Sequence, residues 1–294
     1  MNKILTVYKN EVFDFINKDF EVQTLADDCL FTEGPVWNTE GFYLFSDITA
    51  NCIYKIAEDG TKEVFVDQSG TDHEDDPLIK KDQAGSNGLA YDWNGELLVC
   101  QHGSHAISIL RDKKLETFIG SYKNRAFNSP NDLIVHTSQR IYFSDPPYGL
   151  RDGQLNPAHF QPLAGVYCWT DGVVQLVCDR YKYPNGVCLS PDEKILFICS
   201  NKPQEKFVSM YDTSSHLFLG VFAEENGDGI ETDPHGNIYL CSNDGIIILN
   251  SKGERLALIS LPAIPANACW GGKEGKDLLI TAREFVYLIR GLRS

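Results

Sequence analysis

The sequence has no excess of positive charge and no long apolar run. Its 26 lysine and arginine residues are outnumbered by 41 aspartate and glutamate residues, and the formal net charge is −15. Such a chain repels polyphosphate, so neither nucleic acid nor an anionic membrane is an expected partner. No segment has the roughly 20 apolar residues of a membrane span. Residues 1–20 lack the apolar core of a signal peptide, and we expect a cytoplasmic protein.

Several common motifs are also missing. The nine cysteines include no C-x-x-C pair, which disfavours a zinc ribbon and a thioredoxin-like motif. Cys100, Cys199 and Cys241 lie inside apolar runs, where a thiol behaves as a small buried hydrophobe. We therefore expect free cysteines in a reducing compartment. The G-x-S-x-G, Walker and G-x-G-x-x-G patterns are absent, which disfavours serine hydrolases and nucleotide-binding enzymes.

What is present is a repeat of short strands. Six segments share one layout: a polar residue, a short apolar strand, a turn and a stronger apolar strand. They begin at residues 33, 87, 131, 185, 228 and 267, at intervals of 54, 44, 54, 43 and 39 residues. A four-stranded propeller blade repeats at roughly 40–50 residues. The sequence therefore predicts an all-β, six-bladed β-propeller, a single domain over residues 1–294 with residues 1–19 as an N-terminal extension.

The last unit has room for only three strands before the chain ends. We expect residues 20–26, FEVQTLA, to supply its missing outer strand, so that an N-terminal strand completes the last blade. Closing the ring in this way hides a free strand edge.

The first strand of each propeller blade lines the central channel, and its first residue lies at one mouth, near the axis. Here all six such residues carry a side-chain oxygen: Glu33, Asn87, Asn131, Asn185, Asp228 and Asn267. Asn and Asp are common before strands for turn formation alone, but six of six, with a glutamate among them, favour a polar ring. The long connections 67–86, 119–130 and 145–164 are expected on the same face, as walls of a site.

A ring of carboxylate and amide oxygens, without thiolate or imidazole, favours Ca²⁺, Mg²⁺ or Mn²⁺. Neutral asparagines with water suit the roughly six to eight oxygen ligands of Ca²⁺, and Glu33 and Asp228 would balance its charge. Calcium is the first expectation, with Mg²⁺ and Mn²⁺ still open. His102 ends a second strand and so faces the ring. A lone histidine is commonly structural, but this one is a possible proton carrier.

Five ordered motifs cover most of the chain: EGPVW…GFYLFSDI, SNGLAYDWNGELLVCQHG, FNSPNDLIVHTSQRIYFSDPPYGL, NGVCLSPDE and DGIETDPHGNIYL. Together they resemble the gluconolactonase / senescence marker protein (regucalcin-like) family, and within it the bacterial gluconolactonase-like branch. The resemblance implies a six-bladed propeller with an axial divalent cation, Ca²⁺ or Zn²⁺. It further implies the ligands Glu33, Asn185 and Asp228, with Asn131 bound to metal or substrate.

The chain departs from the animal members of this family at Ser129, where they have an arginine. Arg125, Tyr148 or Arg151 from the upper loops are the expected replacements in substrate binding. Many bacterial members have basic residues after an E-H-G motif, whereas this chain has QHGSH at 101–105. We therefore expect a less cationic pocket, which disfavours a phosphorylated lactone.

The predicted function is metal-dependent hydrolysis of a sugar lactone, in which the cation polarises the carbonyl attacked by water. Asp228 is the first choice as base, followed by Glu33 and His102, while Asn131 and Asn87 hold the carbonyl or ring hydroxyls. Two alternatives stay open: an organophosphate-type phosphotriesterase with the same metal site, and a non-enzymatic calcium-binding or docking propeller. The expected partner is a small-molecule lactone, and the expected assembly is a monomer or homodimer.

Overall fold

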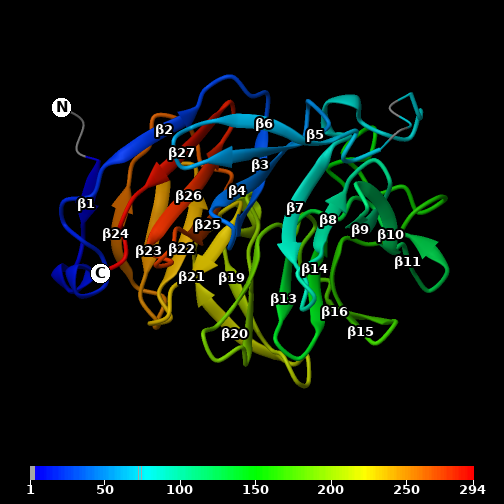
Figure 1. The fold of residues 1–294 in the computed structure, drawn as a ribbon. Coiled ribbons are helices and arrows are strands. Elements are labelled where there is room, and N and C mark those ends of the chain that lie inside the picture. Colours follow the sequence, from blue (N-terminus) through cyan, green and yellow to red (C-terminus); the bar gives the residue numbers. More distant parts are fainter. Residues whose placement is uncertain (1–3, 72, 74) are drawn as a thin grey trace.

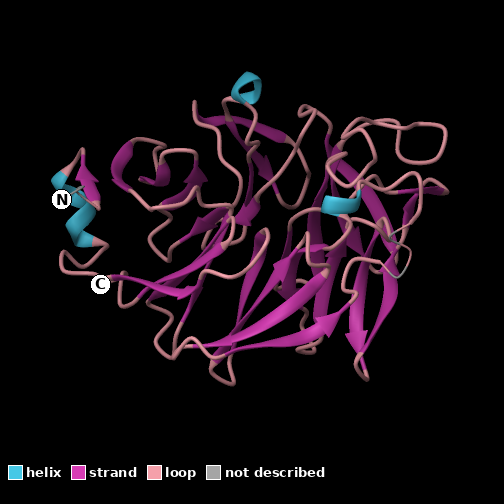
Figure 2. Cartoon of the chain, turned by 90° about the horizontal axis from the view of Figure 1, so that it is seen from above, coloured by secondary structure: helices cyan, strands magenta, loops and turns pink. Residues whose placement is uncertain are grey.

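The computed structural model describes residues 4–71, 73 and 75–294. Six antiparallel sheets, the blades, are arranged in a ring (Figure 1), and strands are the main element of the chain when it is seen from above (Figure 2). This arrangement confirms the six-bladed β-propeller that the sequence predicts. No helix in the described part of the chain has both the length and the apolar character of a membrane span.

Each blade is a meander whose strands follow chain order outward from the channel. Blade I comprises β3 (Thr32–Asn38), β4 (Phe42–Asp47), β5 (Cys52–Ala57) and β6 (Lys62–Asp67). Blade II comprises β7 (Ser86–Tyr91), β8 (Leu97–Gln101), β9 (Ala106–Arg111) and β10 (Lys114–Ile119). Blade III comprises β13 (Leu133–His136), β14 (Arg140–Asp145), β15 (Gly165–Thr170) and β16 (Val173–Cys178).

The second half of the ring repeats this plan. Blade IV comprises β17 (Val187–Leu189), β18 (Ile195–Ile198), β19 (Val208–Asp212) and β20 (Phe218–Ala223). Blade V comprises β21 (Ile230–Thr232), β22 (Ile238–Ser242), β23 (Gly245–Leu249) and β24 (Arg255–Ile259). Blade VI begins with β25 (Asn267–Gly271), β26 (Asp277–Ala282) and β27 (Phe285–Ile289). Outside the blades lie the hairpin β11 (Ser121–Tyr122) and β12 (Arg125–Ala126), and the 3-10 helices η1 (Asn10–Asp14), η2 (Lys81–Gln83) and η3 (Pro203–Glu205).

The N-terminal segment closes the ring. Strand β2 (Val22–Ala26) pairs antiparallel with β27, and Figure 1 shows blue β2 beside red β27. This pairing confirms that residues 20–26 complete the last blade. The segment before it was predicted as an N-terminal extension, but part of it joins a sheet: β1 (Leu5–Val7) pairs with β24 as a fifth strand of blade V. Val12 and Ile16 are buried in the core beside it.

The core lies between neighbouring blades. Every residue of β22 and β23 is buried, because the adjacent blades cover both faces of these middle strands. Outer strands such as β6 are mostly exposed. All nine cysteines are buried and unpaired, in agreement with their positions in apolar runs.

The first strands pack against one another around the channel, in the order β3, β7, β13, β17, β21 and β25. In blades I, II, IV and V this approach requires glycine after the axial residue. A Cβ atom on Gly34 would lie 2.0 Å from the Asn87 carbonyl oxygen, and one on Gly186 would lie 2.6 Å from that of Asp228. Gly186 N donates to the same Asp228 oxygen at 2.9 Å. The E-G, N-G and D-G pairs of the sequence thus hold the blades together at the axis.

Candidate functional site

A small polar cavity, the axial cavity, lies at the mouth of the channel where the first strands begin. Its volume is about 90 Å³. Five of the six predicted ring residues line it: Glu33, Asn87, Asn131, Asn185 and Asp228. The remaining walls come from connections at the same mouth: Phe31, Ile48, Gln83, Tyr148, Asn201 and Arg283.

Two of the three long connections that were expected to wall in the ring reach this cavity. Gln83 comes from 67–86, of which residues 72 and 74 lie outside the described part, and Tyr148 comes from 145–164. The third connection, 119–130, contributes no lining residue. The walls therefore come chiefly from the strand ends.

A chain of hydrogen bonds joins four of the ring residues. Asn87 Nδ2 donates to Asn131 Oδ1 at 2.6 Å, and Asn131 Nδ2 donates to Asn185 Oδ1 at 2.8 Å. Asn185 Nδ2 in turn donates to Asp228 Oδ1, which also accepts from Asn201 Nδ2 at 3.1 Å. The amides thus all point in one direction around the axis, and this series of hydrogen bonds ends at the carboxylate of Asp228.

The two carboxylates of the cavity lie 195 residues apart in the sequence and interact with each other. Burial raises the pKa of Glu33 well above its usual value, and the nearby charge of Asp228 raises it further. Burial also raises the pKa of Asp228, against the lowering effects of the Asn201 hydrogen bond and of the Arg283 and Lys202 charges. Two such groups repel each other unless a proton or a cation compensates their charge.

The oxygen atoms of the cavity suit a hard divalent cation. Glu33 Oε2 accepts from Gly34 N at 3.0 Å, and the Oδ1 atoms of Asn131 and Asn185 each keep a second lone pair. Asn87 Oδ1 is buried and has no hydrogen-bond partner among the described residues, which costs free energy unless a ligand reaches it. Within the described residues, no cluster of three His, Cys, Asp or Glu side chains could hold a metal. The fit therefore depends on the asparagines.

His102 lies behind the ring, fully buried. Its Nδ1 is 3.0 Å from the Gln83 carbonyl oxygen and must carry the proton, so Nε2, at 3.3 Å from Asn87 Nδ2, is an acceptor. Burial lowers the pKa of His102 to about 4, so the ring is neutral near pH 7. This geometry orients Asn87 and does not bring the imidazole into the cavity.

The expected substrate-binding residues of the upper loops separate into two groups. Tyr148 lines the axial cavity, and its hydroxyl donates to Asn201 Oδ1 at 3.1 Å. Arg125 and Arg151 lie outside it. Both are exposed, and both donate to backbone carbonyls of neighbouring loops. Their guanidinium groups connect neighbouring loops, so the structure does not place them in the axial cavity, where we expected substrate-binding residues.

Cations reach the site from elsewhere in the fold. Arg283 follows β26 and lines the axial cavity, and Lys202 follows β18 and adjoins Asp228. Neither cation was predicted from the sequence, from which we expected a less cationic pocket. His102 was selected because it directly follows a second strand, and Arg283 holds the same position in blade VI. Lys202 comes four residues after β18, so this rule would not have selected it.

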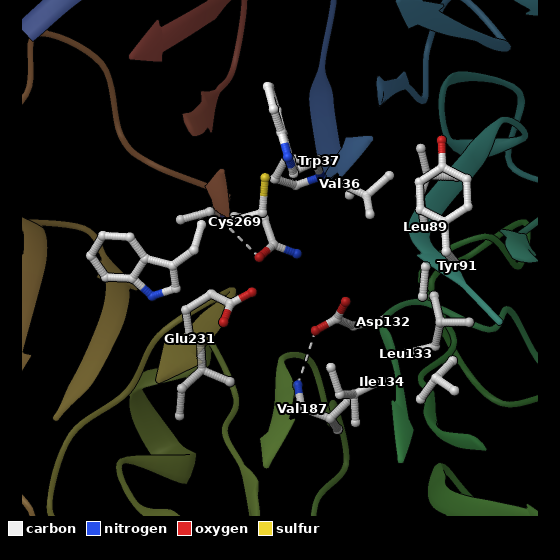
Figure 3. Close-up of a pocket in the computed structure, with 18 residues that line it drawn as sticks. Val36, Trp37, Leu89, Tyr91, Asp132, Leu133, Ile134, Val187, Glu231 and Cys269 are labelled. Carbon is white, nitrogen blue, oxygen red and sulfur yellow. Dashed lines mark hydrogen bonds between the residues drawn. The ribbon is translucent and has the colours of Figure 1, made fainter. Parts of the chain in front are cut away.

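Beyond the ring, the channel widens into a second cavity of about 390 Å³, which we call the lower channel (Figure 3). Apolar side chains of the first strands form most of its wall, together with Asn267, the sixth ring residue. Figure 3 shows the carboxyl groups of Asp132 and Glu231 facing each other across it. Asp132 Oδ2 accepts from Val187 N at 2.9 Å. Burial raises the pKa of Asp132 to about 7 and that of Glu231 to about 8.

Residues 31–284 match the family model described as the SMP-30/Gluconolactonase/LRE-like region. The gluconolactonase of Zymomonas mobilis is 32% identical over 92% of this chain and 81% of its own. A lactonase of Staphylococcus epidermidis is 23% identical over 89% of this chain and 77% of its own. Both alignments extend over most of the propeller.

Solved structures show the same fold. A gluconolactonase of Xanthomonas campestris superposes with a TM-score of 0.84 at 25% identity, over 99% of this chain and 95% of that one. A calcium-binding protein of Agrobacterium tumefaciens, regucalcin, superposes with a TM-score of 0.72 over 93% and 94% of the two chains, and at 17% identity this is a likeness of fold alone. The chain therefore belongs to the SMP-30/Gluconolactonase/LRE-like family, the family that its five motifs resemble.

Proposed function

We propose that this protein hydrolyses a sugar lactone at the axial cavity with the help of a divalent cation, calcium in the first place. The observation that carries the proposal is the convergence of Glu33 and Asp228 with four asparagine side chains in one small cavity. Relatives named gluconolactonase and lactonase support a lactone as the substrate class.

Glu33, Asn131, Asn185 and Asp228 would hold the cation, and the unpartnered Asn87 Oδ1 adds an oxygen to the same cavity. The bound cation would polarise the lactone carbonyl and stabilise the charge that develops on its oxygen. The two carboxylates offset the double positive charge, and the neutral asparagines add ligands without adding charge.

Asp228 is the residue best placed to act as general base. Its Oδ1 accepts from Asn185 and Asn201, which leaves Oδ2 to take a proton from the attacking water. A pKa raised by burial makes this carboxylate a stronger base, while the Arg283 and Lys202 charges favour its ionised form. Glu33 would supply the second balancing charge.

The size of the axial cavity limits what it can hold. About 90 Å³ corresponds to about three water molecules at about 30 Å³ each. That is enough for an ion and the reacting carbonyl group but not for a whole sugar lactone. The remainder of the substrate must extend past Tyr148 and Asn201 into the space that adjoins the cavity.

The test is hydrolysis of a panel of γ- and δ-aldonolactones by protein treated with EDTA, and again after Ca²⁺, Mg²⁺, Mn²⁺ or Zn²⁺ is restored. We expect activity to be lost with EDTA and restored best by Ca²⁺, relative to spontaneous hydrolysis in the same buffer. Failure to hydrolyse any lactone with any metal would contradict the proposed activity. Hydrolysis that is insensitive to EDTA would contradict the role of the cation.

A further inference from the structure

A second pocket, which we call the side pocket, adjoins the axial cavity. It has a volume of about 230 Å³ and shares Asn201, Asp228 and Arg283 with the axial cavity as common walls. Its other walls come from blades IV, V and VI, and include Lys202 and the polar Asn243. A lactone whose carbonyl lies at Asp228 therefore has room for the rest of its carbon chain here.

Lys202 is held at this pocket by aromatic rings. Its Nζ lies 4.8 Å from the ring centre of Tyr183 and 5.2 Å from that of Tyr148, and the two rings stack on each other at 5.7 Å. No carboxylate among the described residues forms an ion pair with it. An ammonium group held by ring faces keeps its hydrogen-bond donors available for an anion.

Arg283 is held in a comparable way from the opposite side. It starts the two-residue turn between β26 and β27 with a φ of 58°, a conformation in which Gly or Asn is usual and a long side chain is strained. Thr32 fixes this turn, because its N and Oγ1 both donate to the Arg283 carbonyl oxygen, at 2.8 Å and 2.9 Å. The guanidinium lies 4.7 Å from the ring centre of Phe31 and has no ion-pair partner among the described residues.

The charge of this pocket is opposite to that of the molecule. The chain has a net charge of −15, whose field repels anions. The side pocket nevertheless has two cations and one carboxylate, and that carboxylate, Asp228, is already assigned to the cation of the axial cavity. Local cations are what a strongly acidic protein needs if it is to bind an anion.

We propose that Lys202 and Arg283 form an anion subsite, and that the preferred lactone carries a phosphate ester or a carboxylate on the carbon chain away from its ring carbonyl. The inference rests on the proposed function for its reaction, but anion binding can be measured without catalysis. The guanidinium can bind such a group with two parallel hydrogen bonds, and the ammonium adds a point charge.

The experiment compares three substrates: glucono-δ-lactone, 6-phosphoglucono-δ-lactone and a glucarolactone. The variants are Lys202→Met and Arg283→Gln, with Lys206→Met as the matched control, because Lys206 is exposed, lies outside the pocket and changes the net charge equally. We expect each pocket variant to lower the ratio of kcat/KM for the charged lactone to that for the neutral lactone by about tenfold. Lys206→Met should leave this ratio unchanged. The phosphate and the carboxylate arms show which anion is preferred.

Calorimetric binding of 6-phosphogluconate and gluconate supplies the second readout. Tighter binding of the phosphorylated acid that is lost in Lys202→Met supports the subsite even if no lactone is hydrolysed, and then only the proposed activity fails. Equal losses of affinity for gluconate and for 6-phosphogluconate overturn the subsite, because they show that the two cations serve only to stabilise the Asp228 carboxylate. Arg283→Lys, which keeps the charge, separates loss of the anion contact from disturbance of the strained turn.

Discussion

The axial cavity and the lower channel are built on the same first strands, and in both of them burial raises the pKa values of two carboxyl groups, but the side chains around those groups differ. In the axial cavity, Glu33 and Asp228 lie among four asparagine side chains, and two of these amides, Asn185 and Asn201, donate to Asp228. In the lower channel, Asp132 and Glu231 stand among apolar side chains (Figure 3), and burial raises their pKa values to about 7 and about 8.

The difference shows that acidic residues alone do not make a cation site. The lower channel is the larger cavity, about 390 Å³ against about 90 Å³, and it too has two carboxyl groups. Its wall adds one amide side chain, that of Asn267, whereas the axial cavity has four asparagines, so it offers a hard cation fewer oxygen ligands, and protonation is the cheaper way to remove the charge. The number of neutral asparagines distinguishes the two ends of the channel.

The largest expected effect tests this distinction directly. Asp228→Asn should lower kcat for lactone hydrolysis about 10³-fold, because it removes both the base and one of the two balancing charges. Glu231→Gln, the matched change in the lower channel, should leave kcat within about threefold. Initial rates on glucono-δ-lactone measure both, with thermal unfolding as the control for folding. Similar losses in the two variants would contradict a site confined to the upper mouth.

A smaller effect concerns stability in the lower channel. Asp132 Oδ2 accepts from Val187 N at 2.9 Å and so ties blade III to blade IV. Asp132→Ala should lower the free energy of unfolding by about 1–3 kcal/mol, because the buried Val187 N–H loses its acceptor. Asp132→Asn keeps an acceptor oxygen and should cost much less. Urea unfolding measures both, with the exposed Asp152→Ala as control, and equal effects of Ala and Asn would refute the hydrogen bond as the cause.

The pH dependence of stability sharpens the same comparison. The pKa of Glu231 is about 8 in the folded protein and about 4.3 in the unfolded chain. The folded state therefore holds a proton that the unfolded chain releases, and stability falls as the pH rises between these values. Glu231→Gln should remove this loss and stabilise the protein by about 1 kcal/mol or more at pH 9, with little change at pH 4. Urea unfolding at pH 4, 7 and 9 tests this, and a difference independent of pH would contradict it.

The sequence predicted the ring, because a propeller repeats at its first strands and the repeat is visible in spacing. Five of the six axial residues line one cavity, and β2 closes the ring as expected. Asn267 was placed with them, but it lies in the lower channel, where its Oδ1 accepts from Ala268 N at 2.8 Å. Spacing fixes the strand on which a residue sits and not the direction of its side chain.

Residues outside the repeat were harder to predict. Arg283 directly follows the second strand of its blade, as His102 does, but it lies outside the repeated polar position from which the ring was predicted. Strand β1 adds to blade V through contacts between residues that are far apart in sequence. Pairing of this kind depends on which strand edge is free in the folded ring. The local sequence pattern does not contain that information.

The smallest expected effect tests whether the substrate site extends beyond the axial cavity and the side pocket onto the loops. If loop arginines bound the substrate, Arg125→Ala and Arg151→Ala would raise KM for an anionic lactone. In the structure both guanidinium groups are exposed and donate to loop carbonyls, outside the axial cavity and the side pocket. We therefore expect KM to change less than about twofold, the range of an ordinary surface substitution of about 0.5 kcal/mol or less. A tenfold rise in KM for either variant, measured beside Arg283→Gln, would extend the site from the strand ends onto the loops, because only direct contact with the anion produces an effect of that size.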